Sequence, residues 1–446
     1  MKRKFVSFCL LSFILLVPVA NFVPKLEVKP VCATLPDITS QEVTRPTTSG
    51  GEWNLYKVGD ELCFQCGYLW TTKACRLWKT SDLGNTTPSW TLVRDAPVNI
   101  TFWGNSYLTN DGKWLYGQVT NWTSGESGIY GYRLNVSSGS ITRLTHEMVR
   151  LGWTNIKMNA FTEGNNKIYH ANYADTTPPP DGSGGIGNMT HGGEHITMFW
   201  NMTEECDALH THAVWYSLAT ERLYFSLDQG AGYIDTTNNR LTWIRGGSGV
   251  SNASSMCQEV EIGDETEIIT GSDSTSETFV DRWTLDGTFL NKYSVEFADQ
   301  HLYKKIFIHG DKAILAGNQI GMASNNHGIM LLSLVDGSYK WIKNSTDPND
   351  AVVNIERFGN YIYFMWGAKL FMINLTDVAL YDYTADSNNI QLRYLSGGTL
   401  DSFTYSSDKL KLTISDTSTS TTKVYCSDKG EPREVYSTNG TLSWSY

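Results

Sequence analysis

Two short stretches of the sequence place histidines and carboxylates close enough together for metal chemistry. The first is "MTHGGEHITMFWN", in which His191, Glu194 and His195 have the H-x-x-E-H order of an inverted zinc-peptidase motif. That motif acts from a helix, which brings both histidines to one metal. Gly192 and Gly193 interrupt it here, and the preceding "DGSGGIGNMT" has no helical pattern. We therefore do not predict a peptidase, and keep His191 and His195 as candidate metal donors or bases.

The second stretch is "DALHTHAVW", which contains His210 and His212. Alternate residues of a strand point to the same side, so H-x-H presents both imidazoles to one metal ion. Asp207 is the candidate third ligand. Imidazole and carboxylate donors suit one divalent transition metal, Mn or Zn. The alternative is that these are solvated loop histidines, or histidines satisfied by neighbouring hydrogen bonds.

The surrounding sequence predicts strands in nearly every segment. Short runs rich in Tyr, Trp, Ile and Val alternate with Gly, Asn and Asp turns, as in all-β folds built from hairpins. A repeat is clearest in "DGKWLYGQVTNWTSGESGIYGYRLNVSSGSITRLTH", and weaker copies recur along the chain at roughly 50-residue spacing. That period and strand count are typical of propeller blades.

The segments "DGKWLYGQV…GIYGYRLNVSSGSITRLTH" and "HTHAVWYSLATERLYFSL" resemble the TolB-like β-propeller repeat. The resemblance implies an all-β fold, a seven- or eight-bladed β-propeller, and says little about function. We expect a signal peptide at 1–33, a flexible leader at 34–51, and a propeller at 52–446 with a long insert at about 176–194. The two ends of the propeller are expected to share a blade, because an open ring leaves unpaired strand edges.

Blade architecture predicts where the histidines lie. The loop between the second and third strands of a blade and the junction to the next blade open on the same face. We assign seven of the nine histidines to loops or junctions on that face: His146, His191, His195, His210, His212, His301 and His327. Binding and catalytic groups usually lie on such loops. We predict that any functional site of this chain lies on this face.

The spacing of Asp207, His210 and His212 is similar to the metal site of oligogalacturonate lyases, where a Gln stands in place of Asp207. The motif also lies mid-chain here rather than near the C-terminus. The resemblance implies a polysaccharide (uronate) lyase working by β-elimination. The metal would neutralise the substrate carboxylate so that a base can remove the C5 proton. His191, His195 or His146 is the candidate base.

Other residues are candidates for contacting a ligand on this face. Exposed tryptophans stack on sugar rings and dominate many interfaces, and Trp103, Trp153 and Trp215 lie near blade junctions. Most other aromatic residues are expected to pack between blades. Arg143 and Arg150 are the cations expected to meet an acidic ligand.

The N-terminus predicts export. A basic start is followed by an apolar stretch and by Val31 and Ala33 at cleavage spacing, which indicates a signal peptide. An uncleaved N-terminal anchor is the alternative, and no other apolar stretch is long enough to span a membrane. The formal charge is −11, which argues against nucleic-acid binding. Numerous N-x-S/T sequons suit a secreted glycoprotein.

Cleavage would remove Cys9 and Cys32 and leave an even number of cysteines, which fits an oxidising compartment. A hairpin in "DELCFQCGYLWTTKACRLWK" predicts a Cys66–Cys75 disulfide; zinc binding by Cys63 and Cys66 is the alternative. The leading prediction is a secreted platform that binds a carbohydrate or protein partner outside the cell. The metal-assisted lyase is the second.

Overall fold

The computed structural model describes most of residues 35–426. The positions outside the description within this range are 97–98, 104, 124, 147–155, 175–183, 207, 209, 248–253, 263–264, 274–278, 296–300, 319–326, 348–349, 351, 379–382, 386–389, 397–398, 407–408 and 416–422. The described chain is almost entirely β, with one short helix, α2 (Met202–Cys206), between two blades. No helix in this part of the chain is long and apolar enough to cross a membrane.

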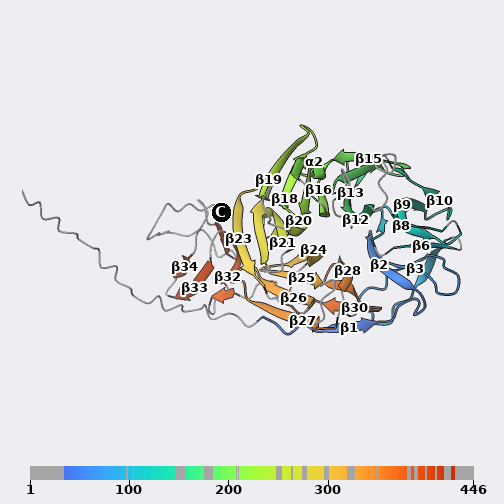
Figure 1. The fold of residues 1–446 in the computed structure, drawn as a ribbon. Helices are drawn as coiled ribbons and strands as arrows, with labels where there is room; N and C mark the ends of the chain where they lie inside the picture. The colour runs from blue at the N-terminus through green and yellow to red at the C-terminus, as the bar shows by residue number, and fades with distance from the viewer. Residues whose placement is uncertain are drawn as a thin grey trace, which may run out of the picture.

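Seven sheets, antiparallel except for the short strand β11, form the seven blades of a β-propeller, arranged as a ring in Figure 1. Blade 1 contains β2 (Gly51–Val58), β3 (Glu61–Tyr68), β4 (Arg76–Thr80) and β5 (Thr91–Asp95). Blade 2 contains β6 (Ile100–Phe102), β7 (Tyr107–Leu108), β8 (Trp114–Asn121), β9 (Glu126–Asn135) and β10 (Ile141–Arg143). Blade 3 contains β12 (Ile156–Gly164), β13 (Lys167–Ala174), β14 (Ile186–Thr190), β15 (His195–Trp200) and the added β11 (Thr145–His146).

The next three blades follow the same consecutive order. Blade 4 contains β16 (Thr211–Ser217), β17 (Arg222–Leu227), β18 (Gly230–Asp235) and β19 (Arg240–Gly246). Blade 5 contains β20 (Ser254–Ile262), β21 (Glu265–Ser272), β22 (Phe279–Thr284) and β23 (Phe289–Ser294). Blade 6 contains β24 (His301–His309), β25 (Lys312–Asn318), β26 (His327–Ser333) and β27 (Tyr339–Ser345).

Blade 7 closes the ring with strands from distant parts of the sequence. Its β28 (Val352–Phe358), β29 (Tyr361–Trp366) and β30 (Lys369–Asn374) are joined by β1 (Ser40–Val43), which pairs antiparallel with β30. A shared blade closes the ring, as expected, but the N-terminal strand meets β30 and not the C-terminal segment of the chain. The expectation that 34–51 is a flexible leader is wrong for the strand β1, because pairing with β30 fixes its backbone and Val43 is only 2 % exposed.

The C-terminal part of the chain departs from the predicted range of the propeller. The seven blades end at β30, and the strands that follow form two smaller sheets. These strands are β31 (Tyr383–Ala385), β32 (Ile390–Ser396), β33 (Thr399–Ser406), β34 (Lys409–Ser415) and β35 (Lys423–Cys426). Figure 1 places β32, β33 and β34 outside the ring. The last of these C-terminal strands, β35, pairs with β32 and not with a strand of a blade.

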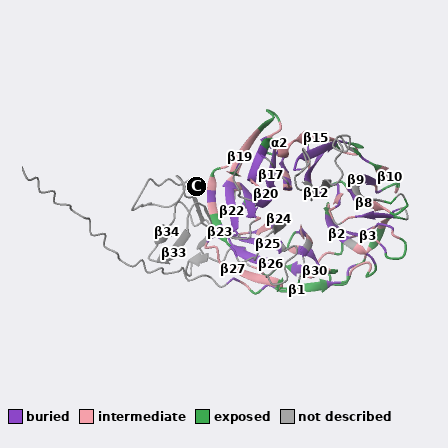
Figure 2. Ribbon diagram, viewed as in Figure 1, coloured by how far each residue is buried: buried purple, intermediate pink, exposed green. Residues whose placement is uncertain are grey.

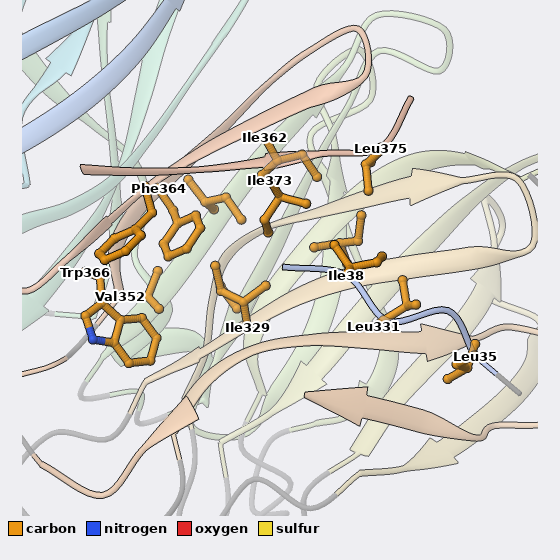
Figure 3. Close-up of a cluster of buried hydrophobic side chains, with 14 residues drawn as sticks. Leu35, Ile38, Ile329, Leu331, Val352, Ile362, Phe364, Trp366, Ile373 and Leu375 are labelled. Atoms are coloured by element: carbon orange, nitrogen blue, oxygen red, sulfur yellow. The ribbon is translucent and has the colours of Figure 1, made fainter. Parts of the chain in front are cut away.

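Buried residues, purple in Figure 2, follow the strands of the blades, and the apolar ones among them form clusters between neighbouring blades. Between blades 6 and 7, Leu331 and Ile329 meet Phe364 and Ile373 in one buried cluster, shown in Figure 3. Leu35 and Ile38, ahead of β1, add to the same cluster. Burying a side chain of this size stabilises the fold by about 2 kcal/mol. The N-terminal segment is thus packed against the ring as well as paired with it.

The Cys66–Cys75 disulfide prediction is wrong. Both thiols are free, as are those of Cys63, Cys206 and Cys257. The register places Cys66 opposite Arg76, so Cys66 and Cys75 point to opposite faces of blade 1 and pack in different clusters. Cys63 and Cys66 are separated in the same way, which argues against a shared zinc ion. Burial raises the pKa of the Cys66 thiol to about 11, which keeps it protonated at neutral pH.

Candidate functional site

A cluster of histidines and aspartates joins blades 4 and 5 on one face of the ring. We call this the upper face; the loops between second and third strands and the blade junctions open on it. His210 and His212 lie at the junction that begins β16. Asp228 directly follows β17, and Asp273 directly follows β21, both in second-to-third-strand loops. Four potential metal donors from two neighbouring blades therefore open on the upper face.

His212 is held between two carboxylates. Its Nε2 lies 2.9 Å from Asp228 Oδ1 and 2.9 Å from Asp273 Oδ2, and its side chain is only 7 % exposed. The strand pairing shifts register between Thr211 and Ala213, a bulge of the kind that re-aims a side chain. The bulge falls at His212 itself, so local backbone geometry sets the direction of this imidazole.

His210 approaches the same carboxylate as His212. Its Nδ1 lies 3.4 Å from Asp228 Oδ1, and its backbone N–H donates to Asp228 Oδ2 at 3.0 Å. The imidazole rings of His210 and His212 are 5.7 Å apart between centroids. One ligand atom from each of His210, His212 and Asp228 lies within 4.8 Å of the others. Three side chains thus converge on a volume of the size that one metal ion occupies.

The carboxylates change the protonation of this cluster. Burial alone would lower the pKa of His212, but its hydrogen bonds to Asp228 and Asp273 outweigh burial and raise the pKa to about 9. Burial alone would raise the pKa of Asp228, but hydrogen bonds from His210 and His212 outweigh it and lower the pKa well below its ordinary value. Without a metal, His212 is a buried cation at neutral pH, paired with two carboxylates.

A glycine beside the cluster fixes the turn that carries Asp228. Gly230 has φ +143°, and a Cβ there would lie 2.0 Å from the Arg245 backbone oxygen. We expect Gly230→Ala to destabilise the fold by about 3 kcal/mol, because both the backbone angle and the contact are unfavourable. Gly59→Ala is the matched control. Gly59 has φ +58°, but a Cβ there would have no atom within 4 Å, so this substitution should destabilise the fold by only about 1 kcal/mol. Urea unfolding of both variants measures the difference; equal losses would contradict the steric reason.

The structure corrects the predicted position of His191 and His195. The connection between β13 and β14 ends before Ile186, so the insert is shorter than 176–194 and His191 lies in the β14–β15 turn. Turns between third and fourth strands open on the lower face, away from His210. His191 Nε2 lies 3.8 Å from Asp111 Oδ1, and His195 Nδ1 lies 2.9 Å from Thr145 Oγ1. The two residues are therefore not donors to the upper-face cluster.

The other predicted residues are distributed as follows. Asp207, Arg150 and Trp153 lie outside the described residues, as do the side chains of His146, His301 and His327. Arg143 is exposed on the outer strand of blade 2.

Two predicted aromatic residues are half-buried. Trp103 donates from Nε1 to Thr120 Oγ1 at 3.1 Å. Trp215 packs against the cluster between blades 4 and 5 and also lines a cavity of about 430 Å³ with residues of the inner strands. Neither is a broadly exposed platform.

Sequence reasoning missed Asp228 and Asp273. Both follow an apolar second strand directly, in "RLYFSLDQG" and "TEIITGSDS". These are second-to-third-strand loops, the same type of loop to which the sequence assigns candidate histidines. A search of those loops for carboxylates would have found both residues.

Comparisons with known proteins agree on the fold. No protein-family model matches the chain, and no curated protein matches it. A structure of a catalytically inactive variant of virginiamycin B lyase from Staphylococcus aureus, with quinupristin, is 15 % identical with a TM-score of 0.50. The match covers 76 % of this chain and 99 % of that one.

A second structure is the extracellular domain of a protein described as a hybrid two-component system from B. thetaiotaomicron. It is 9 % identical with a TM-score of 0.51, and the match covers 84 % of this chain and 46 % of that one. Identities this low show the fold alone. The comparisons and the strand pairing together identify the chain as a seven-bladed β-propeller.

Proposed function

We propose that this protein is a secreted β-propeller that binds an extracellular glycan or protein partner on its upper face, through a divalent metal held by His210, His212 and Asp228. The observation that supports this most directly is the convergence of these three ligand atoms within 4.8 Å. Asp273 contacts His212 and would stabilise that ligand from the neighbouring blade. Asp207 remains a candidate ligand on sequence grounds.

The donor set fits Zn²⁺ or Mn²⁺. Both ions accept imidazole nitrogen and carboxylate oxygen. A metal would replace the His212 proton as the positive charge between the carboxylates. The side chains of His210 and Asp228 are 19 % and 29 % exposed, so solvent and a ligand can reach the site. An oxygen of the bound partner would complete the coordination.

Metal analysis tests this proposal. Purified mature protein, incubated with Zn²⁺ or Mn²⁺ and desalted, is expected to retain about one equivalent of metal. The His210→Ala/His212→Ala variant is expected to retain none. His210→Ala alone is the second variant, because His210 is the more exposed histidine and its loss disturbs the buried ion pairs least.

The matched control is His191→Ala/His195→Ala, which removes two histidines from the lower face. It should retain the metal. Equal metal content in both double variants would place the ion elsewhere. Absence of metal from the folded wild-type chain would overturn the proposal.

A lyase working by β-elimination on a uronate polysaccharide is the second candidate function. It is favoured by the H-x-H pair, which provides metal ligands beside solvent. His191 and His195 lie on the other face, and His146 pairs with Ile196 on the outer edge of blade 3, next to His195, so the base would have to be another residue. Ultraviolet absorbance of the unsaturated product from polygalacturonate would separate the two functions. Formation of product by wild type, and its loss in the His210→Ala/His212→Ala variant, would establish the lyase. Metal binding without any product would favour the non-catalytic binding platform.

A further inference from the structure

Two of the most exposed apolar side chains project from neighbouring loops of the upper face. Trp70, in the β3–β4 loop of blade 1, is 57 % exposed, and Trp122, at the start of the β8–β9 loop of blade 2, is 53 % exposed. Both loops connect second and third strands, as the loops of Asp228 and Asp273 do. Exposed apolar side chains that gather in one patch, unlike scattered ones, are typical of interaction sites.

A lysine lies at the centre of this aromatic surface. Lys73 Nζ is 4.9 Å from the centroid of Trp122, 5.7 Å from that of Trp70 and 5.3 Å from that of Tyr68. We call these four residues the aromatic–lysine platform. One ammonium group therefore links the loops of blades 1 and 2 through three rings.

The platform is held in place before any ligand binds. Tyr68 and Trp70 meet edge to face, 4.8 Å between ring centroids. Trp122 donates from Nε1 to Thr101 Oγ1 at 2.9 Å, which orients its ring. Lys73 has φ 52°, and its backbone N–H donates to Leu69 O at 2.8 Å, which closes the loop as a tight turn. A fixed platform loses little conformational entropy on binding.

We infer that the aromatic–lysine platform binds an acidic polysaccharide. The apolar faces of sugar rings would stack on Trp70 and Trp122, while the carboxylate of a uronate residue would pair with Lys73. The inference rests on the proposed function as a binding platform, names the glycan as its partner, and does not require the metal.

The surface suits a glycan better than a protein. Stable protein interfaces bury about 800 Å² on each partner around an apolar centre. Among the described residues, the other exposed large apolar side chains are Leu92, on the outer strand of blade 1, and Leu218, on the lower face. Neither extends the platform. Two indoles around one cation match the alternating apolar and charged features of a uronate chain.

Binding to polygalacturonate, with dextran as the neutral probe, tests the inference by isothermal titration and affinity electrophoresis. We expect wild type to bind polygalacturonate and Trp70→Ala/Trp122→Ala to bind about 30-fold more weakly, as for two central contact residues. Lys73→Gln should weaken binding about threefold and reduce its salt dependence. Circular dichroism checks that each variant is folded.

Matched controls lie on the other face. Leu218→Ala removes an exposed apolar side chain, and Lys57→Gln removes an exposed lysine that also lies over an aromatic ring. Both should bind like wild type. Equal affinity of the tryptophan variant and wild type would overturn the inference but leave a glycan-binding platform elsewhere. Tighter binding of dextran than of polygalacturonate would overturn the claim that the ligand is an acidic polysaccharide. Failure of wild type to bind either polysaccharide would overturn the inference and point to a protein partner. The metal site is tested separately, by the metal that the protein retains.

Discussion

The Arg282→Met variant is expected to lose about 3–5 kcal/mol of folding free energy. Arg282 is fully buried and donates from Nε and Nη2 to the two oxygens of Glu267, at 2.7 and 2.8 Å. Its Nη1 also donates to Tyr293 Oη at 2.9 Å. Removing the guanidinium would leave the Glu267 carboxylate buried without its cation. Urea unfolding followed by tryptophan fluorescence measures the loss.

The double variant Arg282→Met/Glu267→Leu is the control for this prediction. It removes both charges together, so it should be markedly more stable than Arg282→Met alone. If the double variant is no more stable than the single one, loss of packing rather than the uncompensated charge explains the effect. Glu267 lies on β21, the strand that leads to Asp273, so this pair also supports one wall of the candidate site.

Metal-free protein is expected to lose about 3 kcal/mol of stability between pH 6.5 and pH 9. The pKa of His212 is raised to about 9 in the folded chain from an ordinary value of 6.5, so the folded state binds a proton that the unfolded state has released. Its contribution is complete below pH 6.5 and is lost as pH rises through 9. The lowered pKa of Asp228 affects stability at acidic pH. The free energy of folding that this carboxylate contributes is lost as the pH falls below 3.8.

Urea unfolding of chelator-treated protein across this pH range tests the prediction. His212→Gln is the matched variant, because an amide can still donate a hydrogen bond to Asp228 but does not titrate. The stability difference between wild type and His212→Gln should shrink steadily from pH 6.5 to 9. A constant difference would show that His212 is not protonated in the folded protein.

The sequence contains enough information to predict the propeller but not its ends. Alternating apolar strands and Gly or Asn turns repeat locally, so the blades could be inferred one by one. Closure depends on Ser40–Val43 meeting β30 more than 320 residues later, a contact that short-range patterns do not encode. The C-terminal strands share the composition of the blades, and only their pairing distinguishes them from an eighth one.

The candidate metal site could also be predicted only in part, because some of its residues are far apart in the sequence. His210 and His212 stand out because they are two residues apart, whereas Asp228 and Asp273 come together with them only when blades 4 and 5 pack. His191 was misplaced because its segment contains β14, a strand that begins earlier than the polar composition of the insert suggests. The predicted Cys66–Cys75 pair failed for a register reason: shifting a hairpin by one residue reverses the face to which a side chain points.

Titration of Zn²⁺ or Mn²⁺ into chelator-treated protein, with wild type and Asp228→Asn compared by calorimetry, tests the central claim most directly. The metal site predicts one binding event in wild type, with proton release from His212, and a loss of affinity of at least about tenfold in Asp228→Asn. Wild type that binds neither ion, or an Asp228→Asn variant that binds as tightly as wild type, would contradict a metal centre formed by His210, His212 and Asp228.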